Sequence, residues 1–149
     1  MSGSGYKSDM SIDERVLMAI VRIAERFKKH SSAMLKSYGL TFPQYNVLRV
    51  LDVSKNGRNT IKDVNKIMLV SGANMTGITR RLDRIGCIVR TTDPNDERLK
   101  WLEITDKGRQ VLDTVFEEKE QSIKGYLEGY SYEEKCEILE ILRDILHSK

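Results

Sequence analysis

Polar side chains that could bind nucleic acid share one side of a segment predicted to be a helix between residues 71 and 85. Apolar residues from Met75 to Ile85 recur at three- and four-residue intervals, the period of one buried helical face. Amide, hydroxyl and guanidinium groups can read base edges and grip phosphates in a DNA groove. The residues of the polar face are Ser71, Asn74, Thr76, Gly77, Arg80, Arg81 and Arg84. For this helix taken alone, an ordinary solvated face is the simpler interpretation.

The segments around this helix predict a helix-turn-helix followed by a β-hairpin. A preceding helix begins at Thr60, whose T-x-x-D spacing to Asp63 is typical of a helix cap. Residues 69–72 leave enough chain for the turn between the two helices. Residues 87–91 then form a short apolar run, residues 93–96 have the turn sequence Asp-Pro-Asn-Asp, and residues 100–104 alternate in polarity. This order predicts a winged helix-turn-helix, with the hairpin as the wing.

Helices at both ends of the chain are more apolar than a small monomer can bury. A helix is predicted over residues 12–37, and the next one opens with the capping box Thr41-x-x-Gln44. After the wing, a helix begins at Thr105, and a last helix, capped by Ser131, has six large aliphatic residues within nine positions. Exposed apolar faces of this kind usually mark a subunit interface. The interface residues we expect are Val16, Ile20, Ile138, Leu142 and Ile145. One enlarged monomeric core is the alternative.

The predicted fold class is mainly α with a small β-wing: a winged helix-turn-helix flanked by N- and C-terminal dimerisation helices. Residues 1–11 are expected to form a flexible tail. Residues 12–38 and 106–147 are expected to form the helical dimerisation region, and residues 39–105 the DNA-binding domain. The length of 149 residues suits one domain with appended helices.

Charge is unevenly distributed along the chain, although the net charge is only +3. Residues 1–57 have nine basic and five acidic side chains, and residues 58–109 have eleven and seven. Residues 110–149 have five basic and ten acidic side chains. The acidic last third is therefore not expected to lie on a phosphate backbone, whereas the central stretch is free to do so.

Several other classes of protein are disfavoured. The cysteines, Cys87 and Cys136, are too few for a disulfide scaffold, which favours a reducing cytoplasm. No apolar stretch is long enough to span a bilayer, so no membrane partner is expected. His30 and His147 have no acidic or thiol partner at ligand spacing, so no metal or other cofactor is expected. The carboxylates of residues 93–97 have no nucleophile motif or phosphate cradle nearby, and we expect no enzyme activity.

Three motifs, in order along the chain, resemble those of the MarR family of bacterial transcriptional regulators. Residues 40–48 match its L-T-x-x-Q-[WY]-x-V-L helix, and residues 71–76 match the recognition-helix pattern S-x-A-N-[VM]-T. The third motif is the wing signature D-x-R, here Asp96-Glu97-Arg98, followed by a strand and by residues 104–108, which resemble L-T-x-x-G. The resemblance extends from about Ile12 to Leu146.

The resemblance implies a homodimeric, ligand-responsive regulator, a repressor, that binds a pseudo-palindromic operator in double-stranded DNA. Asn74 and Thr76 would face bases, Arg98 would reach the minor groove or its phosphates, and Asp96 would orient that arginine. A purely structural tether of the hairpin tip is the alternative for the Asp96–Arg98 pair. Half-site centres would lie roughly 10 bp apart.

A small aromatic effector is a further partner that the resemblance implies, because relatives bind phenolic compounds between the dimer helices and the winged domain. Core and interface packing is the alternative role for each aromatic residue that could line such a pocket. These residues are Tyr38, Tyr45, Trp101, Tyr126, Tyr130 and Tyr132.

Two positions depart from the family pattern. Gly77 stands where many relatives have arginine, so one DNA contact should differ, and Asn65 stands where the family usually has alanine. A winged-helix module that binds a partner protein instead of DNA is the rival function. An oxidant-sensing regulator is a further variant, although the chain has no cysteine near its first helix.

Overall fold

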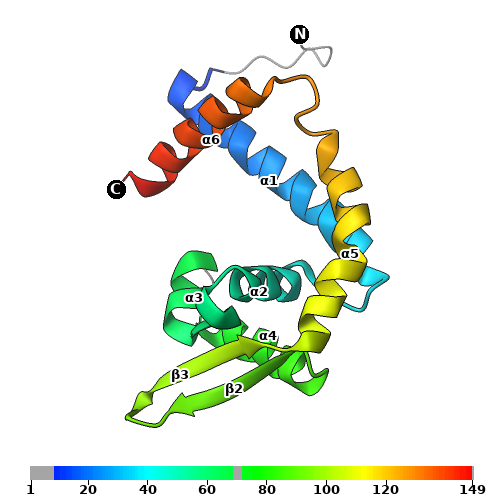
Figure 1. Ribbon diagram of the computed structural model, residues 1–149. Helices are drawn as coiled ribbons and strands as arrows, with labels where there is room; N and C mark the ends of the chain where they lie inside the picture. Colours follow the sequence, from blue (N-terminus) through cyan, green and yellow to red (C-terminus); the bar gives the residue numbers. More distant parts are fainter. Residues whose placement is uncertain (1–8, 69–71, 149) are drawn as a thin grey trace.

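The computed structural model describes residues 9–68 and 72–148, which form six α-helices and one antiparallel sheet of three short strands (Figure 1). The mainly α fold class with a β-wing is thus confirmed. The elements are α1 (Ile12–Lys36), α2 (Phe42–Asp52), the 3-10 turn Lys55–Gly57, β1 (Arg58–Thr60), α3 (Ile61–Met68), α4 (Gly72–Arg84), β2 (Ile88–Asp93), β3 (Asp96–Ile104), α5 (Asp106–Lys124) and α6 (Tyr132–His147).

Side-chain caps begin the helices where the sequence predicts them. The Thr41–Gln44 and Ser131–Glu134 capping boxes are both complete. The Thr60 hydroxyl accepts a hydrogen bond from the backbone N–H of Asp63 at 3.1 Å. These bonds satisfy backbone donors that have no partner inside a helix, and so they fix the first residue of each helix. The predicted cap at Ser71 and most of the predicted turn at 69–72 lie outside the described residues.

The sheet has the strand order β1-β3-β2, which puts β3 in the middle. Strand β1 was not predicted, because three polar residues after a turn give no periodic signal. The hairpin strands also extend further toward the tip than predicted, with pairs from Ile88↔Ile104 to Thr92↔Lys100. The outer part of a hairpin faces water on both sides, so its residues need not alternate between apolar and polar.

The hydrophobic core lies among α2, α3, α4 and the sheet, and the adjoining ends of α1 and α5 contribute to it. Leu48, Leu51, Leu82 and Leu102 have no exposed surface. Leu35 of α1 and Val115 of α5 are also fully buried in this core. The two long helices are therefore attached to the winged domain at one end only (Figure 1).

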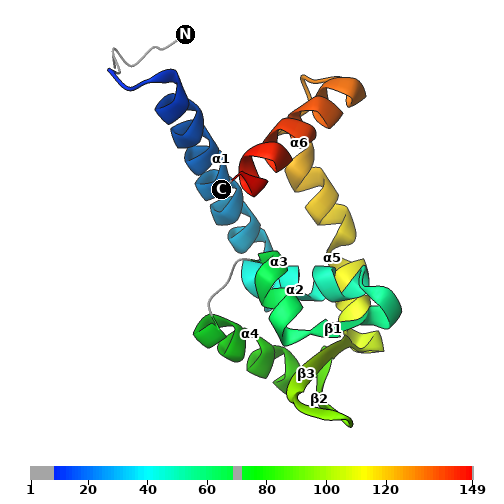
Figure 2. The ribbon, with the colours of Figure 1, turned by 90° about the vertical axis from the view of Figure 1, so that its left-hand side faces the viewer.

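Helix α6 and the free part of α1 leave large apolar surfaces exposed. No residue of α6 is buried, and α6 lies far from the sheet in both ribbon views (Figures 1 and 2). The exposed large apolar side chains of these two helices are Ile12, Val16, Leu17, Met18, Val21, Ile23, Tyr132, Leu139, Ile141, Leu142 and Leu146. Val16 and Leu142 of the predicted interface are 42% and 41% exposed, and Ile20, Ile138 and Ile145 are half-buried. A single monomeric core therefore does not form around these helices.

Asn65 introduces a local cost into α3. Its side-chain oxygen is buried without a hydrogen-bond partner. An unsatisfied buried acceptor costs about 1–3 kcal/mol, and alanine also favours helix more than asparagine does. We expect Asn65→Ala to raise the free energy of unfolding by about 1 kcal/mol and the Tm by about 2–4 °C in thermal denaturation.

Asn59→Ala is the matched control, because the Asn59 amide is satisfied. It donates to the Ser54 hydroxyl at 3.2 Å and accepts from the backbone N–H of Thr60 at 2.8 Å. The same substitution should therefore lower the Tm at Asn59. A lowered Tm for Asn65→Ala as well would show that its amide is satisfied in solution.

Candidate nucleic-acid interface

Helix α4 exposes the polar face that the sequence predicts. Met75 and Leu82 are 1% and 0% exposed, so the opposite face is anchored in the core. Thr79 is also buried, and its hydroxyl donates to the Thr76 carbonyl at 3.2 Å. The side chains that remain exposed are those of Asn74, Thr76, Arg80, Arg81 and Arg84. The fixed packing of one face determines which side chains the other face presents.

The arginines of α4 are available to an outside partner. No ion pair within residues 9–68 and 72–148 engages Arg80, Arg81 or Arg84. Gly77 lies on the same surface, and no atom beyond its own helix lies within 4 Å of the place that a Cβ would occupy. Packing within the chain therefore does not require glycine at position 77.

The wing presents one more exposed arginine. The Arg98 side chain is 93% exposed, and its Nε donates to Asp96 Oδ1 at 3.2 Å. The backbone N–H of Arg98 donates to the same oxygen at 3.0 Å. An exposed ion pair of this kind adds little to stability. The contact between Asp96 and Arg98 is thus present, and its role on DNA stays a prediction.

A second ion pair, which the sequence did not reveal, connects α4 to the wing. Arg90 of β2 donates to Asp83 of α4 through Nε at 3.2 Å and lies 3.1 Å from it through Nη2. The linker between them is also braced, because the Cys87 N–H donates to the Leu82 carbonyl at 2.9 Å and the Thr105 hydroxyl to the Gly86 carbonyl at 2.6 Å. This ion pair and these hydrogen bonds therefore connect α4 to the wing.

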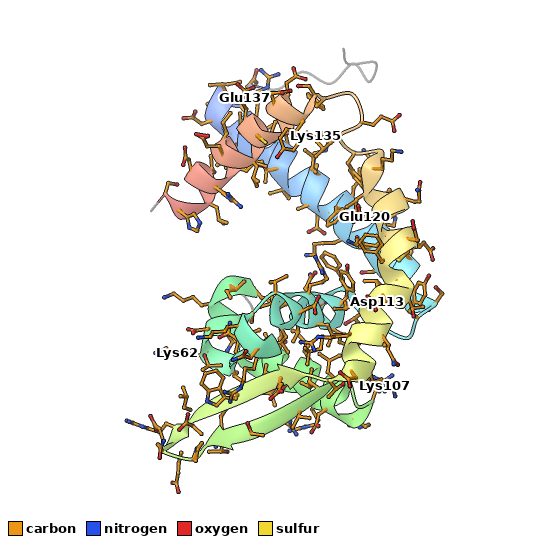
Figure 3. The ribbon with its side chains drawn as sticks, in the orientation of Figure 1. Lys62, Lys107, Asp113, Glu120, Lys135 and Glu137 are labelled. Carbon is orange, nitrogen blue, oxygen red and sulfur yellow. The ribbon has the colours of Figure 1, made fainter. Side chains whose placement is uncertain are left out.

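The recognition helix and the wing lie together at the end of the molecule opposite α6 (Figures 1 and 2). Lys62 of α3 points into solvent, whereas Asp113 and Glu120 lie along α5 and Glu137 lies on α6 (Figure 3). These three acidic side chains thus lie on α5 and α6, not on α4 or the wing (Figure 3). This arrangement agrees with the uneven distribution of charge along the sequence.

The cysteines and histidines of the described residues are not gathered into a metal site. Burial raises the pKa of the Cys87 thiol, although the nearby Lys107 opposes this, so the reactive thiolate is disfavoured. Cys136 is exposed on α6. His30 Nδ1 lies 2.7 Å from the Tyr126 hydroxyl. Within the described ranges, no cluster of histidine, cysteine and carboxylate side chains could hold a metal ion. No helix of the described chain is both long and apolar enough to cross a membrane.

The six aromatic residues considered for an effector pocket are not brought together. Tyr45 lies in the core, Trp101 lies in the sheet, and Tyr130 and Tyr132 are exposed near the start of α6. The Tyr38 hydroxyl donates to Glu118 at 2.6 Å, and this hydrogen bond raises the pKa of Tyr38.

Tyr126 lines a cavity between α1 and the end of α5. Its ring packs edge-on against Phe27 at a centroid distance of 5.7 Å. The cavity has a volume of about 390 Å³, and its lining residues are Arg26, His30, Ser122, Gly125 and Tyr126. A guanidinium, an imidazole and a phenol are thus among its lining groups.

Comparisons with known proteins identify relatives along nearly the whole chain. The profile of the MarR family matches residues 38–99. The HTH-type transcriptional regulator BilQ of Clostridioides difficile is 30% identical over 135 residues, which cover 89% of this chain and 90% of BilQ.

Two solved structures from Streptomyces coelicolor have a similar fold. The MarR family transcriptional regulator Sco5413 has a TM-score of 0.74 and 28% identity, covering 89% of this chain and 91% of its own. Sco3205, a MarR family regulator solved in complex with DNA, has a TM-score of 0.82 and 19% identity, covering 96% of this chain and 91% of its own.

Proposed function

The chain belongs to the MarR family of transcriptional regulators, and from that premise we propose that it acts as a homodimeric repressor of transcription. It binds a pseudo-palindromic operator in double-stranded DNA, with one recognition helix of each protomer in successive major grooves. In this proposal residues 39–105 bind DNA and residues 12–38 and 106–147 form the dimer. The protein works in the cytoplasm, where its DNA is.

The DNA-binding proposal rests on one observation. Helix α4 and the wing both expose side chains that can contact DNA, and the two elements are connected to each other. The exposed donors of α4 suit the major groove, and Arg98 projects from a wing held to α4 by the Asp83–Arg90 pair. A surface that only needed solvation would not require this fixed geometry. In the DNA complex of Sco3205 the same fold binds DNA, which supports the proposal.

The dimer is supported by apolar surface and by charge. Besides their apolar residues, the terminal helices have exposed charged stripes of opposite sign. The basic stripe of α1 is Arg15, Arg22, Arg26 and Lys29, and the acidic stripe of α6 is Glu133, Glu137, Glu140 and Asp144. Both sets recur at helical spacing, so α1 of one protomer and α6 of its partner would be electrostatically complementary.

Regulation by a small aromatic effector completes the proposal. An effector lowers DNA affinity when it binds better to a dimer whose recognition helices do not match the half-site spacing. The cavity near Tyr126 lies between α1 and α5, whose far ends are packed into the winged domain. An occupant there would change how these two helices are placed relative to the winged domain.

The test of DNA binding is the salt dependence of affinity for the DNA that flanks the protein's own gene. Four exposed arginines per protomer (Arg80, Arg81, Arg84 and Arg98) give eight per dimer, so log Kd should rise with log salt with a slope of about 7. Fluorescence anisotropy with a labelled duplex gives this slope, and an unrelated duplex of the same length is the control. No binding to the flanking DNA at low salt would favour the rival, a protein-interaction module.

A further inference from the structure

Trp101, the single tryptophan of the chain, lies where all three strands meet. It is paired with Thr60 of β1 on one side and with Thr91 of β2 on the other. Its side chain is only partly buried. Trp101 is therefore paired both with the wing strand β2 and with β1, the strand that precedes α3.

Two side chains from different strands engage the indole. The Arg58 guanidinium of β1 lies over the ring, 4.0 Å from its centroid, a favourable cation–π geometry. The indole N–H donates a hydrogen bond of 3.1 Å to Asp93 Oδ2 at the end of β2. Trp101 thus connects the strand that precedes α3 to the start of the wing turn.

The connection continues from Asp93 to the exposed arginine. Asp93 Oδ1 accepts the backbone N–H of Asn95 at 2.8 Å. Beyond this turn, Asp96 Oδ1 accepts both the backbone N–H and the Nε of Arg98. Contacts of the side chains therefore run from Arg58 through Trp101 to Asp93, and the backbone pairing of Asp93 with Asp96 connects them to the Asp96–Arg98 ion pair.

The strand pairing is irregular next to the wing tip. The β2–β3 register shifts between Thr92 and Asp93, because Thr92 pairs with Lys100 whereas Asp93 pairs with Asp96. The backbone N–H of Asn95 and the indole N–H hold the pKa of Asp93 below its usual value of 3.8. Asp93 is therefore ionised, and accepts both bonds, at any pH at which DNA binding is measured.

We propose that Trp101 is a positioning residue for Arg98: through its bond to Asp93 and its contact with Arg58, it fixes the angle at which the wing meets DNA. This inference rests on the proposed function. It predicts that the indole N–H matters for DNA affinity although its hydrogen bond is to Asp93 within the protein. A merely structural tryptophan would matter for stability alone.

The test is a double-mutant cycle between Trp101→Phe and Arg98→Ala. Phenylalanine keeps an aromatic ring to contact Arg58, and it removes the N–H donor together with part of the ring surface. Trp101→Phe should weaken operator binding about tenfold in the wild-type background and by less than about twofold in Arg98→Ala, because the two act through one contact. Equal weakening in both backgrounds, or none in the wild type, would overturn the proposal.

Thr92→Val is the matched control, because it removes one hydrogen bond of the same hairpin, the 3.1 Å bond from Lys100 to the Thr92 hydroxyl, outside the contacts that run from Arg58 to Arg98. It should leave the affinity within about twofold of wild type. Thermal unfolding followed by circular dichroism establishes that all variants are folded.

A second measurement separates failure of this inference from failure of the proposed function. In the free protein, Trp101→Phe should make the amides of Asn95 and Arg98 exchange with solvent about tenfold faster, since local opening becomes easier. Unchanged exchange would show that Trp101 does not order the wing tip. If the wild-type protein did not bind DNA at all, the proposed function would instead be refuted, and with it any role of the wing on DNA.

Discussion

Replacing both Leu142 and Ile145 with aspartate is expected to convert the protein into monomers and to abolish operator-specific binding. Leu142 is 41% exposed and Ile145 is half-buried on a helix with no buried residue, so neither supports the core of the winged domain. In a dimer these positions would be covered by the partner. Four unpaired carboxylates per interface cost several kcal/mol each to bury, which raises the dissociation constant of the dimer by more than about 10³-fold.

Sedimentation velocity measures this change directly, because a monomer of 17.2 kDa sediments more slowly than a dimer of twice that mass. The expected species is a folded monomer that binds DNA only weakly, because its two recognition helices are no longer held at a fixed separation. The conservative pair Leu142→Met and Ile145→Val keeps the apolar volume and should remain dimeric. A dimer that persists with both aspartates in place would refute the terminal-helix interface.

Replacing Arg98 with alanine is expected to weaken operator binding about 100-fold. A dimer has two wings, and the loss of about 1.4 kcal/mol at each corresponds to a factor of ten per wing. The slope of log Kd against log salt should also fall by about 2, because two charges fewer displace counterions. Fluorescence anisotropy titrations at several salt concentrations measure both quantities.

Lys124→Ala is the control for Arg98→Ala, since it removes the same charge from an exposed position at the end of α5, outside the winged domain. It should change the affinity by less than about twofold, given the screening of distant surface charges. If the two variants lost equal affinity, Arg98 would act only through net charge, and the wing would make no specific contact.

The sequence was most informative where local chemistry decides the structure. Capping residues such as Thr41, Thr60 and Ser131 predicted where helices begin, because each satisfies backbone donors within three residues of itself. The apolar spacing from Met75 to Leu82 predicted the buried face of α4 and hence its exposed one. Family resemblance supplied the Asp96–Arg98 pair, which local spacing alone leaves open between two interpretations.

The contacts that connect α4, the wing and strand β1 could not be predicted from the sequence in the same way. Asp83 and Arg90 are seven residues apart across a helix end and a strand, a separation typical of no pattern. Arg58 and Trp101 are further apart still, and their contact depends on β1, which only pairing with β3 creates. Such contacts follow from tertiary structure. They became visible only when the strand order was known.

The structure also adds information about the surroundings of Gly77. The sequence shows only that an arginine found in many relatives is absent, whereas the surroundings of α4 show open space beside the backbone. Arg80, Arg81 and Arg84 remain on the same exposed face without an ion-pair partner in the described chain. We therefore expect base contacts near Gly77 to differ from those of relatives, while phosphate contacts persist.

Hydroxyl-radical footprinting of the DNA that flanks the protein's own gene tests the central claim most directly. A dimer that presents two recognition helices and two wings should protect two segments with centres about 10 bp apart on one face of the duplex, with further protection at the outer minor grooves. Arg98→Ala should remove only the outer protection. A single protected segment, or two segments whose spacing does not match one helical turn, would contradict the account.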